Sequence, residues 1–173
     1  MNTDEVLTNN TASATDFLGQ RWEFDCMGCA LADGSLKVPG GSIYQGRYCI
    51  LIPDPEIPIP GFFILQPLRH VNSFCELTSS ERQEVGTVLA AAEHALKSLH
   101  IVTELTLVQE ERSRHLHIWI FPMQPWMVEK FGHSISALRE IAAFAKAHNS
   151  SEVTSKVLAA ASQVRDFLSD YLA

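Results

Sequence analysis

The sequence predicts an α+β fold: helices packed on an antiparallel sheet, followed by a C-terminal helical extension. At 173 residues the chain is long enough for one domain with its own core. Stretches rich in β-branched and aromatic residues predict strands at 42–52, 62–66, 101–109 and 114–122. These strands do not alternate regularly with helices, as parallel crossovers would require, so an antiparallel sheet is favoured. We divide the chain into a mobile N-terminal tail (1–20), a core domain (21–125) and the helical extension (126–173).

The predicted tail and the overall composition exclude several classes of protein. Residues 1–20 are rich in Thr, Asn, Ser and Asp without apolar periodicity, and they lack the basic and then apolar pattern of a signal peptide. No apolar run approaches the roughly 18 residues that span a bilayer. The net charge of −7 argues against binding to duplex nucleic acid. We expect a cytoplasmic protein with no membrane partner, whose four cysteines are reduced thiols.

The first half of the core domain contains turn, loop and helix-start signals that separate its predicted elements. The stretch 42–52 reads as strand with a turn at Gln45 and Gly46, and the prolines of "DPEIPIPG" then require a loop. After the short strand 62–66, Thr78 and Glu81 form a capping-box pattern that predicts the start of a helix. That helix has one apolar stripe at helical spacing, made of Val85, Val88, Leu89, Ala92, Leu96 and Leu99.

The stretch "RHLHIWIFP" places two histidines on one face of a predicted strand. Because successive side chains of a strand point to opposite faces, His115, His117 and Trp119 would share one face. A single histidine on a strand is usually a packing or rim residue. Two on one face suggest chemistry, as a nucleophile, an acid–base group or a zinc ligand.

Two helices are predicted beyond Pro125. One is marked by Ile135, Leu138, Ile141, Ala142 and Ala145, and the other by Val157, Ala161, Val164, Leu168 and Tyr171. The second set alternates steps of four and three, which suits packing along another helix.

The region 22–123 resembles the histidine-triad (HIT) superfamily of nucleotide hydrolases and transferases. The resemblance rests on "PGFFILQPLRHVNSFCELTSSE" followed by "HLHIWIFP", with Pro122 seven residues after the first histidine. It implies an antiparallel α+β core, a homodimer in many members, and a pocket for a nucleotide or nucleoside phosphate. It also implies that His117, the middle position of the triad, attacks the α-phosphorus to form a covalent nucleotidyl-histidine. In such proteins a backbone carbonyl commonly receives the proton on the other ring nitrogen.

The same resemblance implies a structural zinc site. Some bacterial HIT proteins, and the related galactose-1-phosphate uridylyltransferases, hold zinc with a C-x-x-C pair, the histidine of "P-x-x-H" and the first triad histidine. This sequence has Cys26, Cys29, His70 and His115 at those places. Two cysteines and two histidines suit tetrahedral zinc in a closed structural site. The alternative is that both cysteines are small buried apolar residues.

The resemblance also suggests residues that bind the substrate. Asp54 stands where many HIT proteins carry an acidic residue that binds the ribose hydroxyls, although a turn before Pro55 would also explain it. Ser113 and Arg114 could meet phosphate oxygens. We rank Ser113 higher, because Arg114 would point away from the histidines if the strand already began there. Arg69 reads as an exposed charge.

Four positions depart from the HIT pattern. Trp119 replaces the third histidine, and an indole donates one N–H but cannot shuttle a proton. Phe62 replaces the histidine after "PG", where it would shape an apolar part of the substrate pocket. Glu111 replaces the usual glutamine and would repel phosphate, and Met123 replaces an arginine.

Three functions therefore stay open. The first is a nucleotide hydrolase or nucleotidyl transferase in which His117 is the nucleophile and Trp119 shapes or stacks on the ligand. The uridylyltransferases also lack the third histidine, so this reading is compatible with Trp119. The second is a module that binds a nucleotide without turnover, and the third is a zinc-stabilised interaction protein.

Overall fold

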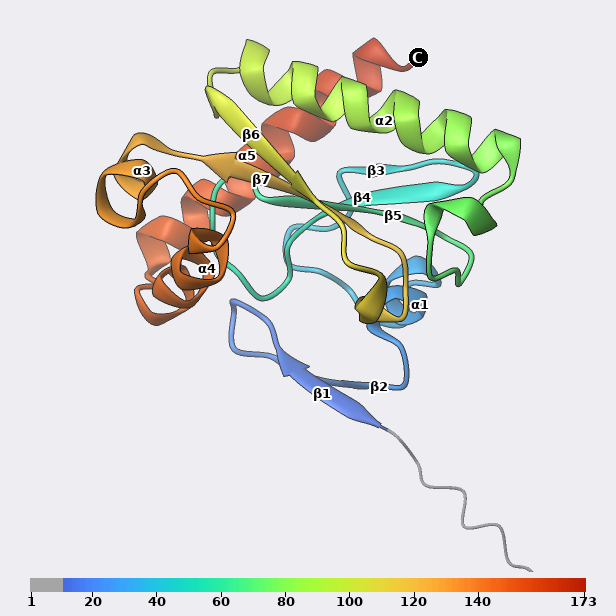
Figure 1. Ribbon diagram of the computed structural model, residues 1–173, viewed down its shortest axis with the longest axis horizontal. Coiled ribbons are helices and arrows are strands. Elements are labelled where there is room, and N and C mark those ends of the chain that lie inside the picture. Colours follow the sequence, from blue (N-terminus) through green and yellow to red (C-terminus); the bar gives the residue numbers. More distant parts are fainter. Residues whose placement is uncertain (1–10) are drawn as a thin grey trace, which may run out of the picture.

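The computed structural model describes residues 11–173, which form a five-stranded antiparallel sheet with helices on both faces and a separate two-stranded hairpin (Figure 1). The strands are β1 (Ala12–Thr15), β2 (Arg21–Phe24), β3 (Tyr44–Gln45), β4 (Cys49–Pro53), β5 (Phe63–Pro67), β6 (Glu104–Val108) and β7 (Ile118–Met123). The helices are α1 (Met27–Ala32), α2 (Ser79–Ser98), α3 (Pro125–Phe131), α4 (Ala137–Ala147) and α5 (Ser151–Tyr171), with short 3-10 turns η1 (Phe74–Glu76) and η2 (Glu111–Ser113). The order in the main sheet is β3-β4-β5-β7-β6, so the predicted α+β fold is confirmed.

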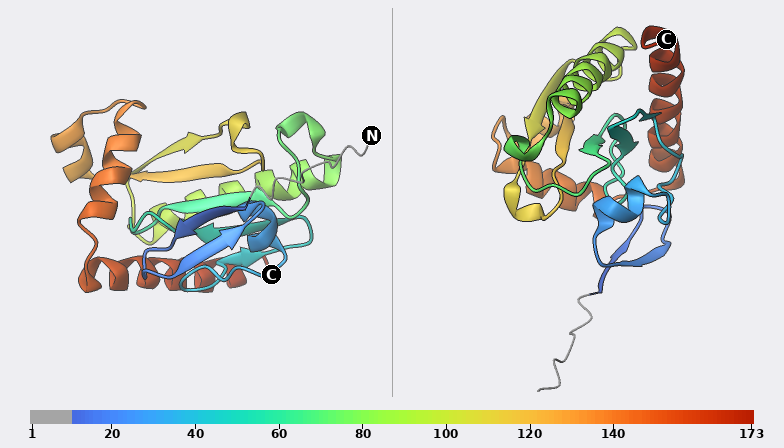
Figure 2. Two further views of the ribbon diagram at one scale, coloured as in Figure 1. Left: turned by 90° about the horizontal axis from the view of Figure 1, so that it is seen from below. Right: turned by 90° about the vertical axis from the view of Figure 1, so that its right-hand side faces the viewer.

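The two faces of the sheet are buried by different elements. In β4, Cys49 and Leu51 pack in the core under α2 and α5, whereas Ile50 and Ile52 pack with Trp22 and α1 on the other face. This alternation is the period of two that a strand imposes on its side chains. Figure 2 shows α2 and α5 along one side of the sheet, with α1 and the β1–β2 hairpin on the other. The second face is the one that carries the functional site.

Helix α2 begins where the capping-box pattern predicted. The Thr78 hydroxyl accepts from the Glu81 N–H at 3.3 Å, and the Glu81 carboxylate accepts from the Thr78 N–H at 2.7 Å. Arg69 is exposed, as predicted, and its Nε and Nη2 donate to the two oxygens of Glu81 at 2.9 and 2.8 Å. The Arg69 hydrogen bonds are the main cause that lowers the pKa of Glu81 to about 2. The loop that carries His70 is thereby tied to the start of α2.

The C-terminal helices complete the core. The predicted stripe of α5 is buried at Val157, Ala161, Val164 and Leu168, and it packs with α2 in the main core cluster. The stripe ends there, because Tyr171 is 55% exposed. In the same way Ile135, predicted in the preceding helix, lies before α4 and is exposed. Among the described residues, no helix combines the length and the apolar character needed to cross a membrane.

The strand that carries the two histidines starts later than predicted. The prediction began it at residue 114, but β7 begins at Ile118. Arg114 has a left-handed φ of 63°, and the Leu116 N–H donates to the Val71 carbonyl at 2.7 Å, outside the sheet. His115 and His117 therefore lie in an irregular approach to the strand. This conformation frees their side chains from the strict alternation of a strand.

Part of the predicted N-terminal tail is structured. Residues 1–10 of that prediction lie outside the described residues, but β1 pairs with β2 in a hairpin. The turn between them is fixed by Asp16, whose carboxylate accepts from the backbone N–H groups of Leu18 and Gln20, both at 2.9 Å. Trp22 of β2 is buried against the sheet and anchors the hairpin. The sequence prediction missed β1 because its small polar residues have no apolar periodicity.

Candidate functional site

The four predicted metal ligands lie together at one end of the sheet. The ligand atoms of Cys26, Cys29, His70 and His115 are all within 4.8 Å of one another. The two thiol sulfurs are 3.5 and 3.2 Å from His70 Nδ1 and both 3.6 Å from His115 Nδ1. A tetrahedral zinc with ordinary bond lengths would place sulfur and nitrogen ligands about 3.6 Å apart. The donor set and its spacing therefore fit a closed tetrahedral metal site.

The His115 ring is already in the protonation form that a metal ligand needs. Its Nε2–H donates to the Pro67 carbonyl at 3.0 Å, so Nδ1 carries the lone pair and points toward the two sulfurs. A second partner of this kind on the far nitrogen is typical of metal-binding histidines. Burial lowers the pKa of His115, which favours the neutral, ligating form. The pKa of Cys29 is raised to about 11, chiefly by burial and then by Cys26, so a cation must displace its proton.

The glycine between the two cysteines is required by the His115 ring. A Cβ at Gly28 would stand 2.4 Å from Cγ of His115 and 2.7 Å from two further ring atoms. The Gly28 carbonyl also accepts from the buried Gln66 side chain at 2.8 Å, which joins α1 to β5. The structure therefore requires a glycine directly before the second cysteine, a requirement that the sequence prediction overlooked.

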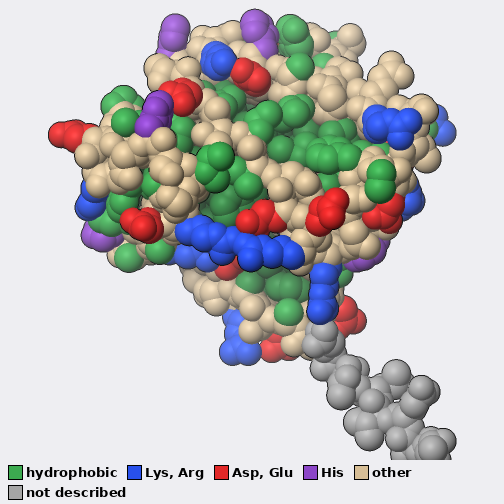
Figure 3. All heavy atoms as spheres, viewed as in Figure 1, with side chains coloured by type: hydrophobic (Ala, Val, Ile, Leu, Met, Phe, Trp, Pro, Cys, Tyr) green, Lys and Arg blue, Asp and Glu red, His purple; other side chains and the backbone are tan. Residues whose placement is uncertain are grey.

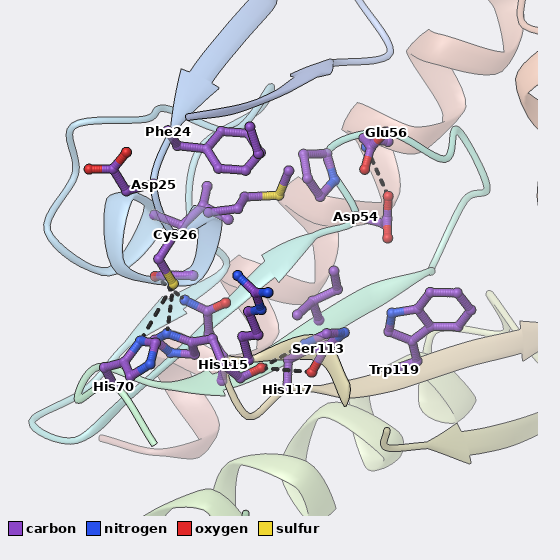
Figure 4. A pocket seen from close by; sticks show the side chains of 18 of the residues that line it. Phe24, Asp25, Cys26, Asp54, Glu56, His70, Ser113, His115, His117 and Trp119 are labelled. Atoms are coloured by element: carbon purple, nitrogen blue, oxygen red, sulfur yellow. Dashed lines mark hydrogen bonds between the residues drawn. The ribbon is translucent and has the colours of Figure 1, made fainter. Parts of the chain in front are cut away.

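His117 lies on the wall of a cavity next to the four candidate metal ligands. This cavity has a volume of about 670 Å³ and is bounded by α1, the loop after β4 and the approach to β7 (Figure 4). His117 Nδ1–H donates to the His115 carbonyl at 3.0 Å. A carbonyl oxygen can only accept, so Nδ1 carries the proton and Nε2 keeps its lone pair in the neutral ring. The carbonyl expected to fix the tautomer is present, and it belongs to His115.

Asp54 and Trp119 also line the cavity, whereas Phe62 does not. Asp54 is 5% exposed, and one carboxylate oxygen accepts from the N–H groups of Glu56 and Ile57, both at 2.8 Å. Burial raises the pKa of Asp54 to about 7 against the effect of these hydrogen bonds. Phe62 is 1% exposed and packs edge-on behind Trp119 with ring centroids 5.3 Å apart. Phe62 therefore acts on the cavity only by supporting Trp119.

Ser113 and Arg114 both line the cavity, but the Ser113 hydroxyl is already engaged by the backbone. The Ser113 hydroxyl lies 2.8 Å from the Glu110 carbonyl and 3.1 Å from the His115 carbonyl, so its proton is directed to the backbone. Arg114 lines the cavity, because its left-handed backbone turns the side chain to the side of the histidines. Glu111, predicted to repel phosphate, is exposed and is not among the residues that line the cavity. Met123 is buried in the core beside α3 and α4.

A smaller hollow of about 110 Å³ lies on the other side of His117 and is closed by α4. Ser113, His117 and Trp119 border both spaces, and Leu138 and Arg139 supply the α4 side of the smaller one. The C-terminal extension therefore forms part of the wall around His117.

No protein-family model matches the chain, and no curated protein matches it. Solved structures do match. A Zn-bound histidine triad family protein from Mycobacterium smegmatis is 16% identical, with 82% of this chain and 96% of that chain covered and a TM-score of 0.56. A hypothetical histidine triad nucleotide-binding protein from Sulfolobus tokodaii is 17% identical, with 84% and 93% covered and a TM-score of 0.56. A hypothetical protein from Leishmania major is 23% identical, with 76% and 97% covered and a TM-score of 0.54.

These similarities show the fold of the chain. It is the histidine-triad fold, with a cluster of two cysteines and two histidines that can hold a metal.

Proposed function

We propose that this protein is a HIT-type nucleotide hydrolase or nucleotidyl transferase that uses His117 as its nucleophile. The observation that carries the proposal is the hydrogen bond from His117 Nδ1 to the His115 carbonyl, which leaves an Nε2 lone pair at the wall of a cavity of about 670 Å³. A neutral imidazole is a good nucleophile near pH 7, and a covalent intermediate splits one displacement into two easier steps. The named similarity to a nucleotide-binding protein supports a nucleotide ligand.

In the first step, Nε2 of His117 forms a bond to the α-phosphorus while the bond to the leaving group breaks and the leaving group takes its electron pair. In the second step, water or another acceptor attacks the same phosphorus and releases its proton to solvent, while the bond from phosphorus to Nε2 breaks and the His117 ring leaves with that electron pair. Asp54 accepts hydrogen bonds from the ribose through the carboxylate oxygen not used by Glu56 and Ile57. Trp119 and its support Phe62 form an apolar wall for the ligand, and Ser113 keeps the backbone around His117 in place.

The metal site has a structural role in this proposal. Cys26, Cys29, His70 and His115 would hold zinc, which keeps α1, the loop after β5 and the approach to β7 in register. His115 then presents its carbonyl to His117 from a fixed position.

The identity of residue 119 limits the leaving groups. An indole cannot pass a proton to a departing oxygen or nitrogen, and the loss of one transition-state donor commonly costs on the order of 10²-fold in rate. Leaving groups that are weak bases, such as phosphates, need no such proton. We therefore propose that phosphoanhydrides and nucleotide sugars are better substrates than phosphoramidates, whose amine must be protonated to leave.

The test is to incubate the protein with a dinucleoside polyphosphate, a nucleotide sugar and adenosine 5′-phosphoramidate. We expect turnover of one of the first two, trapping of a nucleotidyl-protein after acid quench, and loss of both in His117→Ala. His133→Ala serves as the matched control, because His133 is exposed and pairs with Glu104 away from the cavity. Turnover that survives in His117→Ala would refute the assignment of the nucleophile.

Trp119 favours one second candidate, a module that binds a nucleotide without turnover. A saturable rise in melting temperature with nucleotide, but no turnover and no covalent intermediate, would identify it. If the protein neither binds nor turns over a nucleotide, the remaining function is that of a zinc-stabilised interaction protein. A homodimer and a cytoplasmic location stay predictions. The exposed Leu107 on edge strand β6 is compatible with a dimer, and sedimentation equilibrium tests it.

A further inference from the structure

The backbone of Arg114 has a conformation that arginine rarely adopts. Its φ of 63° is left-handed, and among the described residues other than glycine only His100 shares a positive φ. A side chain with a Cβ is disfavoured in this region, where glycine and asparagine are much better accommodated. Strained residues of this kind cluster at functional sites, where the geometry they provide offsets their cost. Arg114 lies directly between η2 and the metal ligand His115, and the strain brings its side chain to the cavity wall.

Arg114 is also the only lysine or arginine among the described residues that line this cavity. Three acidic residues, Asp25, Asp54 and Glu56, line it as well, so a phosphate would meet a net acidic wall without Arg114. Glu56 is partly compensated by Lys146 at 3.0 Å. A bound phosphate therefore needs a fixed cation, and only one is present on that wall.

The side chain of Arg114 is free to bind a ligand. Within the described part of the chain it makes no ion pair and no side-chain hydrogen bond. The other two arginines of this region are engaged, since Arg112 and Arg139 pair with Glu110 at 2.9 and 3.0 Å. Figure 3 shows how basic side chains gather in a band with acidic neighbours on the face seen in Figure 1. A guanidinium has donors in a fork that matches two phosphate oxygens.

We infer that Arg114 is a phosphate-binding residue that holds the phosphate of the ligand beside His117. This inference rests on the proposed function and deepens it: the ligand must bear an anionic phosphate, and the positive charge beside it comes from the residue before the first histidine. Ser113, which sequence reasoning ranked above Arg114, directs its hydroxyl proton to backbone carbonyls.

A substitution at this position should change the melting temperature and the phosphate affinity in ways that distinguish a phosphate-binding residue from a structural one. Arg114→Gly removes the guanidinium and also relieves the left-handed backbone, so we expect a higher melting temperature together with weaker phosphate binding. A merely structural arginine would give a lower melting temperature. Arg114→Gln tests the need for the positive charge, and Arg114→Lys tests the need for the forked donors of the guanidinium. Arg112→Gln is the matched control, because it removes the same charge from the neighbouring turn outside the cavity wall.

The experiment measures the dissociation constants of AMP, GMP, CMP and UMP, and of the four matching nucleosides, by isothermal titration calorimetry. We expect the best nucleoside monophosphate to bind Arg114→Gln and Arg114→Gly about 10- to 100-fold more weakly, as the loss of a charge-assisted pair predicts. Arg114→Lys should lie between these variants and wild type, Arg112→Gln should match wild type, and the nucleoside should bind all variants equally.

Equal affinity of wild type and Arg114→Gln for the monophosphate would overturn the inference. If turnover still required His117, the proposed function would stand without it. A wild-type protein that binds none of the eight probes and turns over no substrate would overturn both. A parallel loss of nucleoside and nucleotide binding in Arg114→Gln would show that Arg114 shapes the cavity and does not bind the phosphate.

Discussion

Replacing Gly28 with alanine should disrupt the metal site without altering any ligand. The new Cβ would lie 2.4 Å from Cγ of His115, whereas carbon atoms normally stay about 3.5–4.0 Å apart. The ring would have to move by about 1 Å or more. It cannot do so freely, because its Nε2–H is held by the Pro67 carbonyl.

The size of the effect follows from this displacement. Metal–ligand distances tolerate only about 0.2 Å of change, so His115 could not keep its place among the ligands. We expect zinc affinity to fall on the order of 10- to 100-fold, as it does when the support of a ligand is lost. Overpacking itself costs about 1–3 kcal/mol, or roughly 2–12 °C in melting temperature for a chain of this size.

The assay is zinc content after dialysis against a competing chelator, with thermal unfolding of the same samples. Gly86→Ala is the control, since Gly86 lies in α2 with nothing within 4 Å of the added Cβ. It should keep its zinc and gain up to about 1 kcal/mol, because alanine suits a helix interior better than glycine. Full zinc content and an unchanged melting temperature in Gly28→Ala would refute the steric argument.

Three further predictions concern the metal ligands and the buried carboxyl. Purified protein should contain about one zinc per chain. Cys26→Ser should lose the zinc and lower stability more than Cys49→Ser, which leaves the ligands intact. Equal effects of the two substitutions, by metal analysis and urea unfolding, would count against the site. Because the pKa of Cys29 is raised to about 11, zinc must displace its proton, and chelator competition should show apparent affinity rising between pH 6 and pH 8; a flat profile would contradict this. The folded-state pKa of Asp54 is raised to about 7, so the folded protein keeps a proton that the unfolded chain releases, and stability should fall as pH rises from about 4 to about 7. Asp54→Asn should flatten that slope and raise stability at pH 8 by up to about 4 kcal/mol, measured by urea unfolding at several pH values, whereas an unchanged slope would place the proton elsewhere.

The fold was predictable where local patterns and tertiary packing agree. The capping box of Thr78 and Glu81 set the start of α2, and the stripe of α5 identified its buried face, because both signals depend on neighbours in the sequence. The start of β7 was not predictable from its residues, since Leu116 gives its N–H to Val71 in a distant loop. The β1–β2 hairpin was missed for a similar reason: the burial of Trp22 against the sheet stabilises it.

The candidate site was predictable in its ligands and less so in its cavity wall. Four residues spread over 90 positions of sequence meet in one cluster, as the resemblance to HIT proteins implied. The position of Arg114 on the cavity wall goes with its left-handed φ of 63°, which no residue pattern specifies for arginine. A glycine between two cysteines was the one overlooked signal, since it marks a close approach by another group.

His115 contributes to the site through two different atoms: its imidazole faces the two thiol groups, and its main-chain oxygen accepts a hydrogen bond from the imidazole two residues further on. A redesign that removed the cluster of two cysteines and two histidines would thus have to supply a new anchor for that oxygen. Where the cluster holds a metal, a chelator would therefore act on His117 through the backbone, with the cavity itself left unoccupied.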